Sequence, residues 1–544
     1  MLDFDYVIAG AGSAGCVLAN RLSAHTHNKV LLIEAGGTNH HLFVQMPAAA
    51  GKLYANPKYD WGYQTEPQPQ FNNRRIYWPR GRGCGGSSAI NGMIFIRGNQ
   101  SDYDGWRELG LEGWGYEDVL PYFKRAEGNA TRQDRYHRSE GRLKTGPSQN
   151  FSTIDQMFLD AVNQSGLPFN ADFNGASQLG GGRYDVNVYK GRRWTAANAY
   201  LEDIRKRPNL TIMTDSLVHR VLFEGRRASG LEVSQHGRLE KVMAHREVLL
   251  SLGVIGSPQV LLLSGIGPAD ELQPLGIDIV TDLPGVGSNL QDHLNITTQY
   301  DCTDPNLTFD RYSRPDRTAL LGLQYLLSRS GPAASTFWSA GAFKAIDQSS
   351  NYPDLQMTLT PMVLVEDPRE RDKVTMKALP GYQLDATQLR PESRGYLKLR
   401  TTNPTDHPII DPCYLTAEKD KRDMIEGVKW ARELASQPAF DKARGPEIAP
   451  GSAVQSDADL LDYVTAYAYS GYHPTCTCKM GVGSDANAVL DSELRLRGIE
   501  NLRVVDASVM PFVTSGNTHA PTVMIAEKAA DMILGNPPLL LDEV

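Results

Sequence analysis

The sequence predicts a mixed α/β fold, α+β overall, in which a helix-flanked sheet is assembled from distant segments and a second domain has a mainly antiparallel sheet. Three observations predict it. A buried-type strand runs into a glycine-rich turn and a helix over residues 5–22, a second strand and helix follow at residues 247–267, and short alternating segments lie between about 300 and 400. A chain of 544 residues also exceeds what one core usually supports, so two domains are expected.

The first element is a β-α-β unit. Residues 5–9 form an apolar strand, residues 30–33 form a second one, and between them lies the run Gly10-Ala11-Gly12-Ser13-Ala14-Gly15. The three glycines allow the turn, the approach of the backbone to a pyrophosphate, and close packing of helix on strand, while the helix N-terminus attracts phosphate. Glu34 follows the second strand at the offset expected for a carboxylate that holds ribose hydroxyls. The unit therefore predicts a Rossmann-like site for an adenine dinucleotide, without separating FAD from NAD.

A glycine- and serine-rich loop over residues 77–93 is the second binding element. Its glycines remove side chains from the path of a ligand, and its free backbone N–H groups can donate hydrogen bonds. A flexible linker would not carry Trp78, Arg80 and Asn91 among the glycines. We therefore expect the loop to wrap a polar ligand.

The middle of the chain supplies the remaining elements. Residues 247–253 predict a buried strand, and residues 257–267 a helix with proline at its start and glycine after its end. The alternating segments 354–359 and 396–399 predict antiparallel strands. The charged stretch 366–373 indicates an exposed loop or a lid, and segment 320–327 an amphipathic helix packed on the second domain or resting on a membrane.

The C-terminal part carries two candidate histidines. His473 precedes a proline in a turn, and His519 lies between a strand at residues 502–506 and a final helix at residues 523–534. Imidazole titrates near neutrality and suits the removal of a proton. Apolar candidates for a pocket wall, or for ordinary core packing, are Phe337, Trp338, Met362 and Leu364.

Composition excludes several classes of protein. Lys plus Arg total 55 against 63 Asp plus Glu, so there is no basic excess to bind nucleic acid. The six cysteines are too few and too scattered for a disulfide framework, and no metal site is expected. No apolar run reaches the ~18–20 residues of a membrane span, and the early first strand leaves no room for a signal peptide. We expect a cytoplasmic protein, with peripheral association at the inner membrane as a further possibility.

These residues together resemble the glucose-methanol-choline (GMC) oxidoreductases, FAD enzymes that oxidise alcohols. The resemblance covers nearly the whole chain. Its motifs are residues 10–15 with Glu34, 81–93, 253–267, 284–293, 389–395 and 472–474, and the closest similarity is to bacterial sorbose, choline and aliphatic alcohol dehydrogenases.

The resemblance implies a cofactor and its contacts. Residues 1–155, 195–297 and 480–544 would form a discontinuous FAD-binding domain, and residues 156–194 and 298–479 a substrate-binding domain. Some relatives attach the flavin covalently to a histidine just before the asparagine of the second loop; this chain has Ile90 there, so non-covalent FAD is expected. The implied FAD-binding residues are Gly10, Gly12, Ser13, Ala14, Gly15, Glu34, Ala35, Arg80, Gly83, Gly86, Ser87, Asn91, Gly92, Met93, Val218, Asp506, Ala507 and Thr518.

The resemblance also implies a reaction. His473 would take the hydroxyl proton of an alcohol while hydride passes to flavin N5, and His519 would be the second member of the catalytic pair. The substrate would be a small primary alcohol, polyol or sugar-type alcohol, and the product an aldehyde or ketone. Electrons would pass to a quinone, a redox protein or O2. The alternatives are an O2-using oxidase and a lyase or photodecarboxylase of the same fold.

Overall fold

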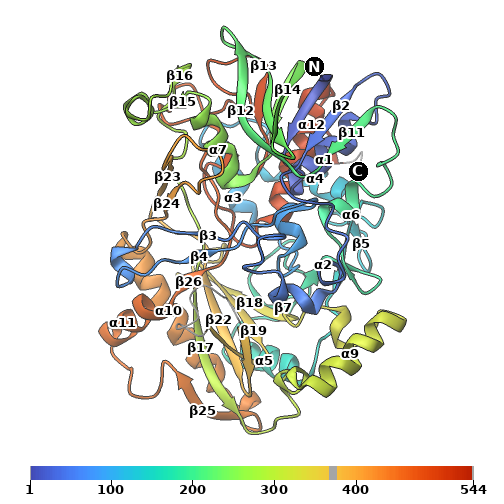
Figure 1. The fold of residues 1–544 in the computed structure, drawn as a ribbon. Coiled ribbons are helices and arrows are strands. Elements are labelled where there is room, and N and C mark those ends of the chain that lie inside the picture. The colour runs from blue at the N-terminus through green and yellow to red at the C-terminus, as the bar shows by residue number, and fades with distance from the viewer. Residues whose placement is uncertain (1, 367–375, 542–544) are drawn as a thin grey trace.

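The computed structural model describes residues 2–366 and 376–541 and contains two seven-stranded sheets, one above the other in Figure 1. The predicted mixed α/β class is confirmed. The charged stretch that predicts a loop or lid lies outside the described residues, apart from Glu366 at the end of its strand.

The upper sheet is mainly parallel around the N-terminal strand. β1 pairs in parallel with β2 and β14, β11 with β2, and β27 with β14, whereas β12 and β13 extend the sheet antiparallel. The strands in spatial order are β11 (Leu210–Met213), β2 (Val30–Ile33), β1 (Leu2–Ala9), β14 (Arg238–Leu250), β13 (Arg227–Gln235) and β12 (Ser216–Glu224), with β27 (Leu502–Val504) beside β14.

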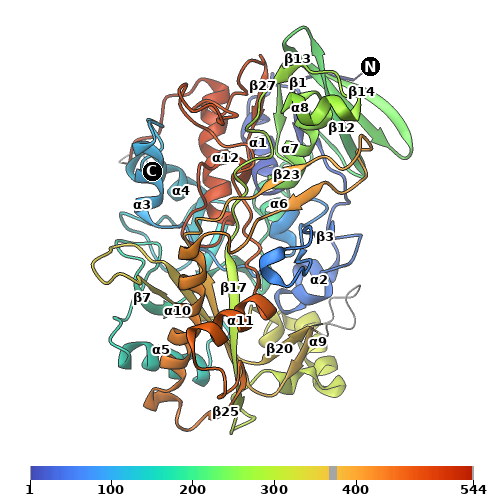
Figure 2. The same cartoon turned by 90° about the vertical axis from the view of Figure 1, so that its left-hand side faces the viewer.

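The helices complete the layers. Near the top of the molecule, the C-terminal α12 packs along α1 and α4 (Figure 2), so the two ends of the chain meet beside the upper sheet. Lower down, α10 covers one face of the second sheet. The helices are α1 (Ser13–Leu22), α2 (Leu42–Gln45), α3 (Gln100–Glu108), α4 (Tyr116–Ala126), α5 (Thr153–Gln164), α6 (Ala196–Tyr200), α7 (Gly253–Leu263), α8 (Ala269–Leu272), α9 (Pro315–Ser328), α10 (Glu418–Ala435), α11 (Asp457–Tyr467) and α12 (His519–Leu534).

Two helices begin earlier than the sequence predicts. α7 starts at Gly253, so Pro258 lies inside the helix rather than at its start. Proline cannot donate to the carbonyl four residues before it. The freed carbonyl of Val254 accepts a hydrogen bond from the Thr477 hydroxyl at 2.6 Å instead, which lets the helix tolerate the proline. α12 likewise starts at His519, four residues before the predicted start.

The lower sheet is antiparallel at every pairing along its length, as predicted for the second domain. The predicted strand at residues 354–359 corresponds to β19. The strands in order are β25 (Arg444–Ala449), β17 (Leu294–Cys302), β22 (Tyr382–Gln388), β19 (Leu355–Thr360), β18 (Ala340–Lys344) and β7 (Gly180–Arg183), with β26 (Tyr469–Ser470) beside β17.

The predicted domain boundary at 297/298 falls inside β17, all of which pairs in the lower sheet. The other boundaries stay a prediction. Short strands make small sheets elsewhere: β3 (Tyr63–Gln64) with β4 (Tyr77–Trp78), β5 (Glu127–Asn129) with β6 (Leu143–Pro147) and β8 (Asp185–Val186), β9 (Val188–Tyr189) with β10 (Arg192–Arg193), β15 (Ile266–Gly267) with β16 (Thr281–Asp282), β20 (Val363–Glu366) with β21 (Met376–Leu379), and β23 (Tyr396–Lys398) with β24 (Ile409–Asp411).

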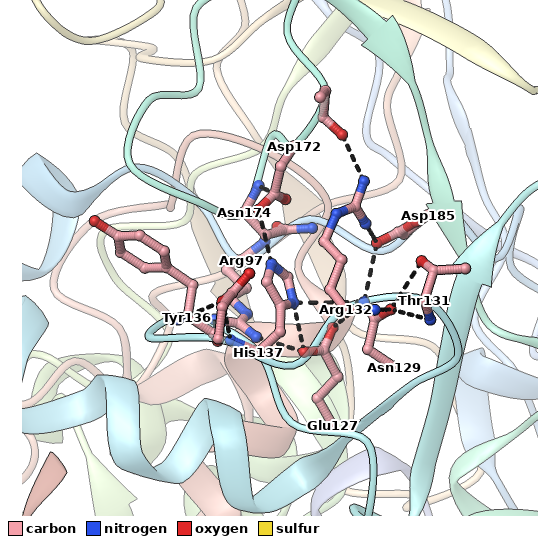
Figure 3. Close-up of polar contacts among 12 residues, drawn as sticks. Arg97, Glu127, Asn129, Thr131, Arg132, Tyr136, His137, Asp172, Asn174 and Asp185 are labelled. Carbon is pink, nitrogen blue, oxygen red and sulfur yellow. Dashed lines mark hydrogen bonds and ion pairs between the residues drawn. The ribbon is translucent and has the colours of Figure 1, made fainter. Parts of the chain in front are cut away.

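A buried ion network ties together the segments beside the second loop (Figure 3). His137 lies between two carboxylates, with Nδ1 2.7 Å from Glu127 and Nε2 2.8 Å from Asp172. Arg97 is 2.8 Å from the same Glu127, and its backbone N–H donates to Asn174. With acceptors on both ring nitrogens, the imidazolium is stabilised, and these hydrogen bonds raise the pKa of His137 to about 9 despite its burial.

α9 confirms the predicted helix around residues 320–327, but most of it is exposed. Tyr325 is the one buried residue of this helix, and its hydroxyl donates to the Gln45 carbonyl at 3.2 Å. Leu327 is 78% exposed and Leu320 66%. Within residues 2–366 and 376–541, no helix combines the length and the apolar character needed to cross a membrane.

Candidate active site

A cavity of about 370 Å³ lies between the two sheets. Four of its lining residues directly follow the carboxyl ends of parallel strands: Gly10 after β1, Glu34 after β2, Ser251 after β14, and Asp506 two residues past β27. In open α/β sheets, ligands bind at this edge because the loops that follow the strands converge there. The cavity is therefore the candidate site.

The glycine turn is shaped to admit a phosphate. Gly10 has φ +94°, a conformation that other residues rarely adopt, and a Cβ on Gly15 would lie 1.8 Å from the Gly10 carbonyl. The N-cap of α1 is Gly12, which provides no side-chain cap. The first N–H groups of the helix are thus left to a ligand at the positive end of its dipole.

Two carboxylates hold the loops around this turn. Glu34 accepts hydrogen bonds from the backbone N–H groups of Ala11, Gly36 and Gly83 at 2.8–2.9 Å. Asp506 accepts from the Gly253 N–H at 2.9 Å and from the Ser257 hydroxyl, and its burial raises its pKa. Both line the cavity, so both acids shape the site. Their direct contacts with a cofactor stay a prediction.

Nearly all the predicted cofactor residues line the cavity. Gly15 and Gly83 do not: Gly15 packs α1 on β1, and Gly83 is bonded to Glu34 behind the turn. The predicted residues that line it are Gly10, Gly12, Ser13, Ala14, Glu34, Ala35, Arg80, Gly86, Ser87, Asn91, Gly92, Met93, Val218, Asp506, Ala507 and Thr518, together with His473 and His519. Of the apolar candidates for the pocket wall, Trp338 and Leu364 line the cavity, whereas Phe337 and Met362 are not among its lining residues.

His473 is held on a fixed backbone. Its N–H donates to Asp292 at 2.8 Å, and the preceding carbonyl, of Tyr472, accepts from Arg80 at 2.6 Å. Tyr472 has φ +63°, so this turn is strained and depends on those contacts. Burial above all, and then the neighbouring His293 and the charge of Arg80, place the pKa of His473 well below its usual range. The imidazole is therefore neutral at neutral pH.

The hydrogen bonds assign the tautomer of His473. Nε2 of His293 is 3.1 Å from the Leu389 carbonyl, which can only accept, so that nitrogen carries the proton. Burial lowers the pKa of His293 to about 3, so its ring is neutral and Nδ1 is an acceptor. That Nδ1 lies 3.0 Å from Nδ1 of His473, which must donate. Nε2 of His473 is thereby left with its lone pair.

The side chain that faces this lone pair is Asn517. Its Nδ2 lies 3.0 Å from Nε2 of His473. His519, the predicted second member of the pair, lines the same cavity, and its Nδ1 is 3.0 Å from the Ser13 hydroxyl at the start of α1. Asn517 stands in the loop before α12, whereas His519 is the first residue of the helix. The role of His519 in a catalytic pair stays a prediction.

Sequence reasoning did not single out Asn517, Asp292 and His293, which the structure brings into contact with His473. A signal existed for each of them. Asp292 and His293 end the motif at residues 284–293, and Asn517 is two positions from the chosen histidine. Another missed residue is Arg193, which is fully buried and donates to the Asn91 carboxamide at 2.9 Å, fixing the second loop.

Several buried polar atoms at the cavity lack a hydrogen-bond partner within the described part of the chain. Three of them are Ser251 Oγ, Asn517 Oδ1 and His519 Nε2. A buried polar group without a partner is costly, so such atoms mark places where a ligand completes the hydrogen bonding. The uncapped helix, the turn without side chains and these three atoms fit a dinucleotide cofactor with a polar ring system.

Comparison with known proteins agrees with this geometry. Residues 4–295 match the N-terminal family model of GMC oxidoreductase, and residues 391–526 match the C-terminal one. The chain belongs to the GMC oxidoreductase family. It is 45% identical over 544 residues to the mitochondrial choline dehydrogenase of Mus musculus, covering 99% of this chain and 90% of the relative. It is 41% identical to the oxygen-dependent choline dehydrogenase of Photobacterium profundum, covering 98% and 94%.

Solved GMC structures share the fold over the whole chain. Pyridoxine 4-oxidase from Mesorbium loti is 32% identical with a TM-score of 0.88, covering 98% of this chain and 100% of its own. Formate oxidase from Aspergillus oryzae is 25% identical with a TM-score of 0.90, covering 98% of each chain. The protein is therefore an FAD-dependent GMC oxidoreductase, of the class that contains alcohol dehydrogenases and oxidases.

Proposed function

We propose that the protein oxidises the hydroxyl group of a small alcohol to an aldehyde or ketone, with His473 as the general base and Asn517 as its partner. FAD, when bound, supplies the hydride acceptor. The observation that carries the proposal is the orientation of His473, whose Nε2 lone pair meets the Asn517 amide at 3.0 Å on the cavity wall.

A substrate hydroxyl between these two side chains would use both. Its proton would go to Nε2 of His473, and its oxygen would accept from the Asn517 N–H as negative charge develops there. The neutral state of His473 suits this step, because the base needs no prior deprotonation. Arg80 and Asp292 keep the His473 backbone in place on either side of its peptide bond.

His519 serves the cofactor side in this proposal. Its Nδ1 contacts Ser13 at the start of α1, and its Nε2 is unpartnered within the described residues. Burial lowers its pKa to about 4, so it is neutral at neutral pH and can donate or accept one hydrogen bond to a ligand. We propose that it contacts bound FAD rather than the alcohol.

The first test records the visible spectrum of the purified holoenzyme anaerobically while alcohols are added. Choline, which names the relatives' substrate, belongs in the panel with primary, secondary and sugar alcohols. Bleaching of the flavin band near ~450 nm is the expected result. The His473→Ala variant should keep the band but bleach slower by a factor on the order of 10²–10⁴. A flavin that no alcohol reduces would favour the lyase alternative.

The reduced flavin must pass its electrons to an acceptor. We propose a quinone or a redox protein as this acceptor. Oxygen uptake at the rate of alcohol turnover would instead identify an oxidase, and reoxidation that needs an added quinone analogue would support the dehydrogenase.

A further inference from the structure

One buried face of the lower sheet is polar where it meets the cavity. Six residues of β17, β22 and β19 line the cavity there, and we name them the polar floor: Asn295, Gln356, Thr358, Gln383, Asp385 and Thr387. Successive side chains of a strand point to opposite faces. The alternate residues, such as Ile296 and Ala386, form the apolar face against α10, where a Cβ on Gly427 would lie 2.9 Å from Ala386. The polarity of the floor is therefore confined to the side that a ligand can reach.

Asp385 organises the floor as a hydrogen-bond acceptor. It accepts from the hydroxyls of Thr297 and Thr360, each at 2.7 Å, and from the Gln383 amide at 2.9 Å. The Tyr469 hydroxyl donates to it at 3.3 Å. All four neighbours donate a hydrogen bond to this one carboxylate. The donors around the floor are therefore committed to Asp385, which itself lines the cavity.

No cation balances this carboxylate in the described ranges 2–366 and 376–541. Asp385 has no cationic neighbour there, and the cavity lining contains a single Lys or Arg, Arg80, which donates to the Tyr472 carbonyl beside the proposed base. A buried carboxylate without a cation is costly unless donors compensate it. The floor thus carries both a surplus of acceptors and negative charge.

Asn295 supplies an independent second observation. Its Oδ1 is buried and has no hydrogen-bond partner among the described residues, although the residue lines the cavity. Asn295 pairs across the sheet with Tyr469, four residues before His473. Thr387 pairs with Asn295 on the other side, two residues before the Leu389 carbonyl that holds His293. The unfilled acceptor and the catalytic base are therefore built on the same strands.

We propose that the polar floor is the subsite for the non-reacting end of the alcohol, and that it selects substrates whose far end carries N–H or O–H donors, as amino alcohols and polyols do. The inference rests on the proposed function and adds the substrate class. A purely aliphatic chain leaves the acceptors of the floor unfilled, and sites built to bond a polar group reject analogues that lack it.

The test compares kcat/KM within matched pairs of alcohols. Butane-1,4-diol differs from butan-1-ol by one hydroxyl, and protonated N,N-dimethylethanolamine differs from choline by one N–H donor at equal charge. We expect the donor-bearing member of each pair to be favoured at least tenfold. Equal values, or preference for the donor-free member, would overturn the proposal. The ratio of 4-aminobutan-1-ol to butane-1,4-diol then separates cationic from neutral donors: a preferred amine assigns the floor to amino alcohols, and a preferred diol assigns it to polyols.

Two variants on β17 test whether the floor causes the preference for donor-bearing alcohols. Asn295→Leu removes the unpartnered acceptor with little change of volume, so folding and the flavin spectrum should persist while the tenfold preference falls severalfold. Thr298→Val is the matched control, because Thr298 lies on the opposite face of β17 and its Oγ1 is also without a partner in the described residues. An unchanged preference in Asn295→Leu would contradict the assignment. All ratios use alcohols that reduce the flavin, so failure of the floor is distinguishable from failure of alcohol oxidation itself.

Discussion

Nδ1 of His293 lies 3.0 Å from Nδ1 of His473, and this contact determines which nitrogen of His473 can act as a base. Nε2 of His293 donates to the Leu389 carbonyl, so its Nδ1 is an acceptor. Nδ1 of His473 therefore carries a proton, and its Nε2 presents a lone pair to the cavity. A buried, neutral histidine thus orients a second one without itself touching the substrate.

Loss of this orienting contact should be visible in kinetics. In His293→Phe, Nδ1 of His473 loses its acceptor and the productive tautomer is no longer imposed, so kcat should fall by about tenfold, the worth of one hydrogen bond. His293→Gln, whose side-chain oxygen can accept the same proton, should restore part of the lost kcat. An equally slow His293→Gln enzyme would mean that His293 only fills space.

The pH profile of the unmodified enzyme follows from the burial of His473. The base must be unprotonated, and its pKa lies well below the usual 6.5. Activity is therefore complete above that folded-state pKa and is lost only as the pH falls through it. We expect kcat/KM to remain flat from neutral pH to below 6.5. An acid limb centred at 6.5 or higher would contradict the neutral, buried base.

Asn517 and His519 should separate cleanly by mutation. Asn517→Ala removes the donor to the developing alkoxide and should lower kcat by a factor on the order of 10²–10³, with FAD occupancy unchanged. His519→Ala should instead weaken FAD retention, measured as the flavin-to-protein absorbance ratio after gel filtration. The reverse pattern, with His519 controlling kcat and Asn517 controlling FAD, would restore the pair expected from the sequence.

The His137 network should make stability depend on pH. The folded-state pKa of His137 is raised to about 9, above the unfolded value near ~6.5. Its stabilisation is fully present below the unfolded pKa and is lost as the pH rises through about 9, a change on the order of 3 kcal/mol. Denaturation midpoints should therefore fall between pH 6.5 and 9.5. His137→Gln should start lower and show a shallower fall; an equal slope in both proteins would remove His137 from the explanation.

Ile90 makes the mode of FAD attachment testable. It is buried, and it stands immediately before Asn91 in the second loop, where a covalent link would need a nucleophilic side chain. Acid precipitation should leave a colourless pellet and a yellow supernatant. Flavin that remains with the pellet through washing would show a covalent bond at another residue.

The sequence predicted best those features that depend on neighbours along the chain. The strand, turn and helix of residues 5–22 each carry their own local pattern, and the glycine positions admit few other structures. Likewise, the alternation at residues 354–359 identified β19 as a strand. The same alternation does not reveal which face of β19 lines the cavity. That depends on the pairing of β19 with β22 and of β22 with β17, which are distant in the sequence.

The directions of the Asn517 and His519 side chains show the same limit. Both residues stand in one turn, two positions apart, and the family resemblance named His519 as the second member of the pair. The position where α12 begins decides their directions. That start lies four residues before the predicted one, since Pro521 is accommodated in the first turn, where its missing N–H costs little. Which of the two residues acts with His473 stays a prediction.

The contact of α12 with α1, and of β27 with β14, has a consequence for biosynthesis. β1 is made long before β27 and α12, the strand and helix that complete its sheet and its cavity. At typical elongation rates of about 5–20 residues per second, nearly 500 residues separate these partners by tens of seconds. The lower sheet therefore has time to fold while the upper sheet is still open along one edge. Nascent chains must be shielded at that edge, and the cofactor can be enclosed only after α12 has been made.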